Sequence, residues 1–274
     1  MGEESRAIDI LMFHSISDGG GPTCISPRVF REQMAILAEA GYAGVSLAEF
    51  LAWWRGEREL AERSVVVTFD DGFEDFRTEA FPELEARGWT ATIFLPAGKL
   101  GGSDDWEVHE GGQKARALMD WEAVAELARA GIDCGAHGVT HRDLTALPWE
   151  VARLEISGSK EMIERAGRCR VTSFAPPYGR TNKWVRSEMR RCYLGAVGTG
   201  MGRAGLTSDV YQLPRVEMWY FRNPARWREY IQGGCRRYFV SRQILRSVRA
   251  FARGANPLTG RWLERGGENP CQLS

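Results

Sequence analysis

Short apolar segments alternate with segments of helical periodicity along most of the chain. Residues 64–69 (SVVVTF) are β-branched and uncharged, which is typical of a buried strand. Residues 26–41 instead carry apolar side chains at the three-to-four spacing of an amphipathic helix. The same patterns predict strands at 8–13, 43–46, 64–69, 89–95, 132–136, 171–175, 193–197 and 210–213, and helices at 26–41, 47–55, 78–87, 121–130 and 148–167. This alternation predicts an α/β fold with a parallel sheet, either open or closed into a barrel.

The composition changes near residue 222. Residues 222–265 contain eleven arginines and only two acidic residues. Within them, 238–253 has the pattern of an amphipathic helix with a stripe of Phe239, Ile244, Leu245, Val248 and Phe251. We therefore predict a domain over 1–222 and a basic, partly amphipathic extension over 223–274.

The overall charge and composition exclude several classes of protein. The 274 residues include 36 basic and 36 acidic ones, and a nucleic-acid binder would normally be basic. No apolar run reaches the roughly 18 residues that a membrane-spanning helix needs. The acidic first residues do not resemble a secretory signal, and the six cysteines form no CxxC pair. We expect a cytoplasmic protein without a cysteine zinc site.

Two adjacent carboxylates, Asp70 and Asp71, directly follow the predicted strand 64–69. Catalytic groups collect at the carboxyl ends of parallel strands. Neighbouring side chains there point in different directions, so that one carboxylate can bind a metal while the other acts as a base. An Asp-Asp-Gly turn that only caps the next helix explains this segment equally well.

The histidines supply a second candidate site. His137 and His141 follow the predicted strand 132–136 and are four residues apart, so they can converge on one ion, with an aspartate from another strand as third ligand. A solvent-exposed histidine pair is the alternative. Of the two other histidines, His14 ends the predicted strand 8–13, where a lone histidine is usually structural, and His109 lies in a glycine-rich loop. Separately, the loop FAPPYG at 174–179 is either a rigid turn or a holder for an oxyanion-binding N–H.

Together these segments resemble the polysaccharide deacetylases of the NodB-homology type, carbohydrate esterase family four. TFDDG at 68–72, HxxxH at 137–141 and APPYG at 175–179 match that family's first three motifs, in order, within a resemblance that covers roughly residues 8–216. The resemblance implies a distorted (β/α)7 barrel of TIM-like type. It further implies Asp70 as catalytic base, a backbone N–H of Tyr178 that stabilises the oxyanion, and the metal ligands Asp71, His137 and His141.

Two departures from the family pattern point to a subgroup. Ala175 stands where typical members have an arginine that orients the base, and the late Leu-x-His motif that supplies the acid is missing, since residues 213–216 read LPRV. LMFH at 11–14 and FAPPYG at 174–179 resemble the permuted poly-β-1,6-N-acetylglucosamine de-N-acetylases, whose acid histidine comes early. This resemblance implies His14 as general acid, with His109 as its competitor.

The implied activity is metal-dependent hydrolytic de-N-acetylation of a sugar in a polysaccharide, an oligosaccharide or a glycolipid. A ligand set of two histidines and one aspartate suits zinc, and also cobalt or nickel. We expect an N-acetylated saccharide as partner and no nucleic acid. Deacylation or deformylation of another aminosugar or small amide stays open, as does a non-catalytic carbohydrate-binding relative. Four aromatic residues are candidates either for stacking on sugar rings or for ordinary packing: Trp106, Trp184, Trp219 and Tyr220.

Two interpretations of the basic extension also remain. Its stripe either packs on the barrel with the arginines in solvent, or lies on an anionic membrane surface beside a lipid-linked saccharide.

Overall fold

The computed structural model describes residues 6–19, 23–106 and 115–252, and strands alternate with helices along most of them. The strands are β1 (Ala7–Ile8), β2 (Ile10–Phe13), β3 (Ala43–Val45), β4 (Ser64–Phe69), β5 (Thr92–Leu95), β6 (Asp133–Ala136), β7 (Ser173–Phe174), β8 (Gly195–Met201), β9 (Ala204–Gly205) and β10 (Leu213–Glu217). The α-helices are α1 (Pro27–Glu39), α2 (Leu47–Trp54), α3 (Phe81–Glu85), α4 (Trp121–Arg129), α5 (Trp149–Gly167), α6 (Lys183–Cys192), α7 (Pro224–Ile231) and α8 (Arg236–Ala252). Shorter turns are η2 (Phe76–Ala80), η4 (Leu144–Ala146), η5 (Pro177–Gly179) and η6 (Met218–Phe221).

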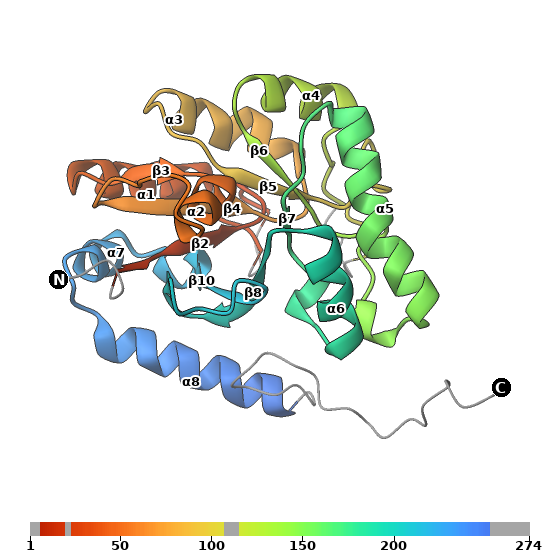
Figure 1. Cartoon of the computed structure of the whole chain (residues 1–274). Helices are drawn as coiled ribbons and strands as arrows, with labels where there is room; N and C mark the ends of the chain where they lie inside the picture. Colours follow the sequence, from red (N-terminus) through yellow and green to blue (C-terminus); the bar gives the residue numbers. More distant parts are fainter. Residues whose placement is uncertain (1–5, 20–22, 107–114, 253–274) are drawn as a thin grey trace.

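Seven parallel strands close into a barrel in the order β2-β10-β8-β7-β6-β5-β4. The closure is made by β2, the first of them in the sequence, which pairs with β10 on one side and with β4 on the other. β3 pairs in addition with the first half of β4. The helices lie around the strands (Figure 1). The predicted (β/α)7 barrel is confirmed, and the sheet is closed.

Alternation along β4 separates two hydrophobic clusters. Val65, Val67 and Phe69 belong to the cluster beneath the surrounding helices, whereas Val66 belongs to the inner one, which also contains Phe50 of α2. Successive side chains of a strand point to opposite faces, so Thr68 and Asp70 continue the inward row of Val66. The fold therefore directs Asp70 into the barrel at the carboxyl end of its strands.

Several elements differ from the prediction, since α6, α7 and β9 were not predicted and one strand is displaced. Helix α6 was not predicted, although Asn182 caps it and Val185 and Met189 are buried along its length, because arginines dominate its short sequence. The strand predicted at 210–213 lies at 213–217 instead. Pro214 falls where the pairing of β10 with β8 shifts register, and a proline without an N–H is tolerated at such an irregularity.

The packing of the barrel continues past residue 222. Trp227 of α7 is fully buried, and its indole N–H donates to the backbone oxygen of Gln33 in α1 at 3.1 Å. Tyr230 stacks on Trp227 and on Phe239 of α8, so both helices are attached to the barrel through aromatic contacts. The side chain of Phe251 lies outside the described residues.

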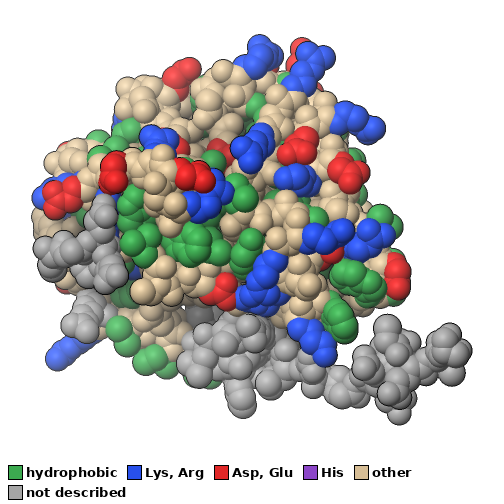
Figure 2. All heavy atoms as spheres, in the orientation of Figure 1, with side chains coloured by type: hydrophobic (Ala, Val, Ile, Leu, Met, Phe, Trp, Pro, Cys, Tyr) green, Lys and Arg blue, Asp and Glu red, His purple; other side chains and the backbone are tan. Residues whose placement is uncertain are grey.

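The outer surface of α8 carries apolar side chains. Val240, Ile244, Leu245 and Val248 are exposed there. Elsewhere, acidic and basic side chains lie close together over much of the face in Figure 2. No helix in the described part of the chain is both long and apolar enough to cross a bilayer.

Candidate active site

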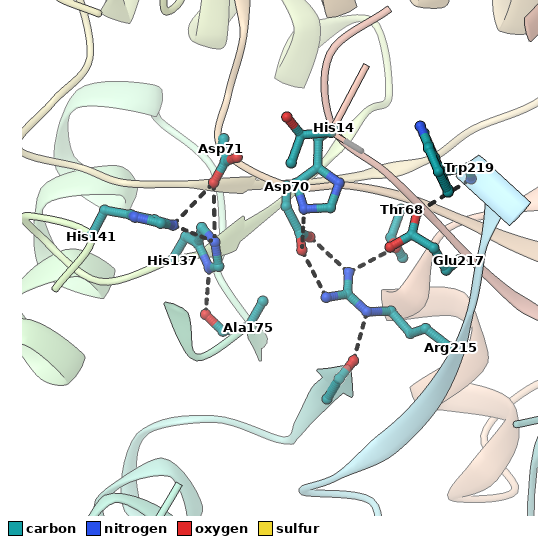
Figure 3. Close-up of polar contacts among 12 residues, drawn as sticks. His14, Thr68, Asp70, Asp71, His137, His141, Ala175, Arg215, Glu217 and Trp219 are labelled. Atoms are coloured by element: carbon teal, nitrogen blue, oxygen red, sulfur yellow. Dashed lines mark hydrogen bonds and ion pairs between the residues drawn. The ribbon is translucent and has the colours of Figure 1, made fainter. Parts of the chain in front are cut away.

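Asp71, His137 and His141 converge at the carboxyl end of the barrel. Asp71 follows β4 and the histidines follow β6, and one ligand atom of each lies within 4.8 Å of the others. Asp71 Oδ1 is 3.3 Å from Nε2 of His137 and 3.1 Å from Nε2 of His141 (Figure 3). All three side chains are buried. The structure thus brings the three predicted ligands together.

The orientation of His137 is set by the third motif. Its Nδ1 lies 2.5 Å from the carbonyl oxygen of Ala175, which can only accept, so Nδ1 carries the proton and the Nε2 lone pair faces Asp71. This contact uses the backbone of residue 175 and does not depend on its side chain. The Nε2 atoms of His137 and His141 face each other at 3.2 Å. Two imidazole nitrogens and a carboxylate oxygen turned toward one point are a donor set that fits a divalent cation.

Burial and mutual contacts shift the pKa values of these three side chains. Burial would raise the pKa of Asp71, but its interactions with His137 and His141 outweigh burial and hold that pKa well below its ordinary value. Burial lowers the pKa of His141, whereas Asp71 and Asp70 outweigh burial at His137 and raise its pKa. An ionised Asp71 and a neutral His141 are the states that a metal requires, whereas any proton on Nε2 of His137 must leave when a metal binds.

The loop between the two histidines is held by Glu155 of α5. Its buried carboxylate accepts from the backbone N–H groups of Val139 and Thr140 at 2.7 and 2.8 Å, and from the Thr140 hydroxyl at 2.5 Å. Sequence reasoning missed this residue, since a glutamate within a helix resembles any solvated one. Glu155 therefore positions the loop that carries His141.

Three predicted site residues have left-handed backbone conformations. Asp71, His141 and Tyr178 have φ values of 75°, 59° and 60°. Such values are uncommon outside glycine and indicate local strain that the surrounding structure must compensate. Each of the three residues lies in the segment that follows a barrel strand: β4 for Asp71, β6 for His141 and β7 for Tyr178.

Asp70 faces away from the three ligands, toward Arg215 of β10. Arg215 Nη1 and Nη2 donate to the two carboxylate oxygens at 2.7 Å each, and its Nε donates to the carbonyl of Gly198 at 2.9 Å. Burial would raise the pKa of Asp70, but Arg215 outweighs burial and lowers it. Arg215 thus provides the base-orienting contact whose usual arginine is replaced by Ala175.

The contact of Arg215 with Asp70 was not predicted from the sequence. Residues 213–216 were considered only because they lack the histidine of the family's Leu-x-His motif. The available signal was a charged residue between the apolar Pro214 and Val216, two positions after the inward-facing Leu213.

His14 lies on the other side of the same carboxylate. Its Nε2 is 3.8 Å from Asp70 Oδ2, and its side chain is 17% exposed. Figure 3 shows Asp70 between His14 and Arg215, and Asp71 turned toward the other two histidines. The competitor His109 lies outside the described residues.

Tyr178 lies beside a cavity of about 430 Å³ that opens next to His141. Its ring contacts that of His141 edge-on at 5.0 Å, and Trp106 lies over the same imidazole at 4.3 Å. Trp184 instead packs on Trp149 of α5, away from this cavity. Of the candidate aromatic residues, Trp106 is the one placed beside His141.

Several known proteins are similar to this chain in sequence. The Bacillus subtilis protein YxkH, named for the polysaccharide deacetylases, is 28% identical over 217 residues, which are 79% of this chain and 73% of that protein. The poly-β-1,6-N-acetyl-D-glucosamine N-deacetylase of Escherichia coli K12 is 33% identical over 126 residues, 44% of this chain but 19% of that protein.

Solved structures of deacetylases are similar to this chain in fold. The Streptococcus pyogenes deacetylase PplD, in complex with acetate, matches 77% of this chain and 92% of its own with a TM-score of 0.66 and 25% identity. IcaB of Ammonifex degensii shares the fold over 82% of this chain and 98% of its own, with a TM-score of 0.67 and 22% identity. The family pattern described as polysaccharide deacetylase matches residues 57–197, which carry the paired aspartates, the paired histidines and the proline loop. The chain belongs to the polysaccharide deacetylase family.

Proposed function

We propose that this chain removes the acetyl group from an N-acetylated amino sugar in an oligosaccharide, a polysaccharide or a glycolipid. The observation that carries the proposal is that the two adjacent carboxylates face different partners. Asp71 faces His137 and His141. Asp70 faces Arg215 and His14. One carboxylate thus belongs to a metal site and its neighbour stays available as a base. The names of YxkH and of the Escherichia coli deacetylase support the same reaction.

Asp71, His137 and His141 would hold the metal, which we propose to be zinc because nitrogen-rich sets of three protein ligands with open positions suit it. When bound, a divalent cation supplies polarisation of the amide carbonyl and a more acidic water molecule.

The side chains of the protein provide the proton transfers. Asp70 is ionised at neutral pH, and each oxygen that accepts from Arg215 keeps a second lone pair for the proton of the attacking water. A bond forms between the water oxygen and the acetyl carbon, and the Tyr178 backbone N–H stabilises the resulting oxyanion. His14 donates a proton to the sugar nitrogen as the C–N bond breaks, so that acetate and a free amine leave.

Metal content and product release test this proposal together. The purified protein, loaded with zinc, should bind one equivalent and release acetate from N-acetylglucosamine oligomers. The His137→Ala/His141→Ala double variant should lose both the metal and acetate release. Full metal occupancy in the double variant would refute the metal site, and a metal-loaded wild type that releases no acetate from any N-acetylated sugar would refute the activity.

A further inference from the structure

A second cavity, of about 370 Å³, lies between η6, α7 and α8. Aromatic rings and arginines line most of its wall: Trp219, Tyr220, Tyr238, Arg222, Arg226 and Arg242. We call these six residues the arginine pocket. None of its lining residues is acidic.

The arginines of the pocket are held in place by the rings. Arg222 lies 4.1 Å from the ring centre of Trp219, and Arg226 lies 4.2 Å from that of Tyr238. Arg242 lies between Tyr238 and Tyr220, at 4.9 and 5.1 Å. A guanidinium stacked on a ring keeps its N–H donors in its own plane, directed away from the ring.

The positive charge of these arginines is only partly offset, since Glu229, which does not line the pocket, interacts electrostatically with Arg226. Among residues 6–19, 23–106 and 115–252, no carboxylate makes an ion pair with Arg222, Arg226 or Arg242. The Nε of Arg242 is buried without a hydrogen-bond partner in the same set of residues. Three guanidiniums stacked on rings around one cavity, whose lining holds no carboxylate, form a site for an anion.

The wall of the pocket is anchored to the barrel. Gln33 of α1 is buried and donates to the backbone oxygens of Met218 and Phe221 at 3.3 and 3.0 Å, which fixes both ends of η6. The Tyr238 hydroxyl donates to the backbone oxygen of Tyr220 at 2.8 Å, which attaches α8 to the same turn. The arginines are therefore mounted on a fixed surface before any ligand arrives.

The pocket lies at the same end of the barrel as the catalytic groups. η6 directly follows β10, so Trp219 is four residues after Arg215 and lies within about 14 Å of it along the chain. Glu217 pairs with Met12, two residues before His14, and Figure 3 shows Trp219 on the side of His14. A saccharide with its amide beside His14 can therefore extend toward the pocket.

We infer that the arginine pocket binds a phosphate group carried by the saccharide substrate. The inference rests on the proposed deacetylase function, because it assigns a class of substrate to that site. Phosphate is favoured over carboxylate because it offers three oxygens and up to two negative charges, which three convergent guanidiniums can share. The preferred substrate is then a phosphorylated amino sugar, or an oligosaccharide linked through phosphate to a carrier.

Binding of glucose 1-phosphate tests the inference without any turnover, because this probe has no acetyl group. Calorimetric titration of the zinc-loaded protein should detect glucose 1-phosphate and not glucose. The Arg222→Ala/Arg242→Ala variant should bind the probe at least about tenfold more weakly, since hydrogen bonds between charged groups are lost. Arg190→Ala is the matched control, because Arg190 is also exposed and lies over a tyrosine ring, that of Tyr211, on a different helix. This control should bind like the wild type.

Two further results would overturn the inference. One is binding that survives loss of the pocket arginines but disappears in His141→Ala, since the phosphate would then sit at the metal. The other is binding of anionic phospholipid vesicles, but not glucose 1-phosphate, through Arg222 and Arg242, since the ligand would then be a lipid headgroup.

Kinetics separate this inference from the proposed function. Acetate release from N-acetylglucosamine 1-phosphate should have a lower KM than release from N-acetylglucosamine, and Arg222→Ala/Arg242→Ala should abolish that difference while kcat stays within about twofold. Equal KM values for the two sugars in the wild type would contradict the pocket and leave the deacetylase activity standing. Probe binding without acetate release from either sugar would contradict the activity and not the anion site.

Discussion

Arg215 donates to both carboxylate oxygens of Asp70, and each partner is almost completely buried inside the barrel. The two residues are 145 positions apart in the sequence. They meet because β4 and β10 lie on either side of β2 in the barrel. Breaking one partner of a buried ion pair leaves the other uncompensated, which costs about 3–5 kcal/mol.

We predict that Arg215→Met lowers kcat about 10²-fold, because the base loses its orientation. Without Arg215 the effect of burial dominates, so the pKa of Asp70 rises. A base must be unprotonated, and the acidic limb of the kcat/KM profile should therefore move to higher pH. Arg186→Met is the control, since Arg186 is also buried but pairs with Asp209. It should lose stability without moving the limb, and an unmoved limb in Arg215→Met would contradict the role of Arg215.

We predict that Asp70→Asn abolishes nearly all turnover while metal stays bound, because asparagine cannot accept the proton and Asp70 faces away from the metal ligands. Metal analysis and acetate release on the same sample measure both effects. If Asp70→Asn loses the metal and Asp71→Asn retains it, the two carboxylates have exchanged roles.

His14→Ala should lower kcat by about 10²–10⁴, the usual contribution of a positioned acid. The matched substitution His109→Ala should change kcat little. The reverse result would remove His14 from the mechanism and with it the resemblance to the permuted subgroup.

Glu155→Gln should weaken metal binding about 10- to 100-fold, as is usual when the groups that orient metal ligands are lost. The amide of glutamine would turn a donor toward N–H groups that need an acceptor. A competitive titration with a zinc chelator measures the change. Glu188→Gln, which alters another buried helical glutamate on α6, should keep wild-type metal affinity. Equal affinities in the two variants would show that Glu155 does not position the loop.

Asp133 links stability to pH. Burial raises its pKa from 3.8 to about 6, so between these values the folded state binds more protons than the unfolded one. The free energy of unfolding therefore falls as pH rises through this window. Asp133→Asn should gain about 1–2 kcal/mol relative to wild type between pH 4 and 7.5, a value that allows for partial exposure. Urea unfolding at both pH values measures it, and a pH-independent difference between the two proteins would contradict the shifted pKa.

The membrane hypothesis for the extension stays a prediction, and the exposed side of α8 defines its test. We expect the protein to sediment with anionic vesicles at low salt and to be released by about 0.5 M salt. Ile244→Glu/Val248→Glu should abolish sedimentation. Leu154→Glu on α5 is the matched control, since Leu154 is 58% exposed and Ile244 57%. Equal sedimentation of the two variants would rule out α8 as the contact.

Elements and site residues that belong to a contiguous sequence pattern could be predicted from the sequence. β4 and the carboxylates that follow it were predicted because β-branched residues and their polar successors are contiguous. Asp71, His137 and His141 were predicted as a group from the resemblance to the deacetylase family, and the structure brings them together. Arg215 and Glu155 were missed because their partners are distant in the sequence and no local pattern marks an arginine or a glutamate as buried.

Barrel closure by the first strand also affects how the protein is made. β2 carries His14, yet its partner β10 emerges from the ribosome only after most of the chain. Its other partner, β4, is synthesised long before β10. In a growing chain, β2 can therefore pair with β4 along one edge while its other edge is still unpaired. His14, Asp70 and Arg215 come together only when that second edge is paired. We therefore expect a nascent or truncated chain that ends before residue 213 to be inactive.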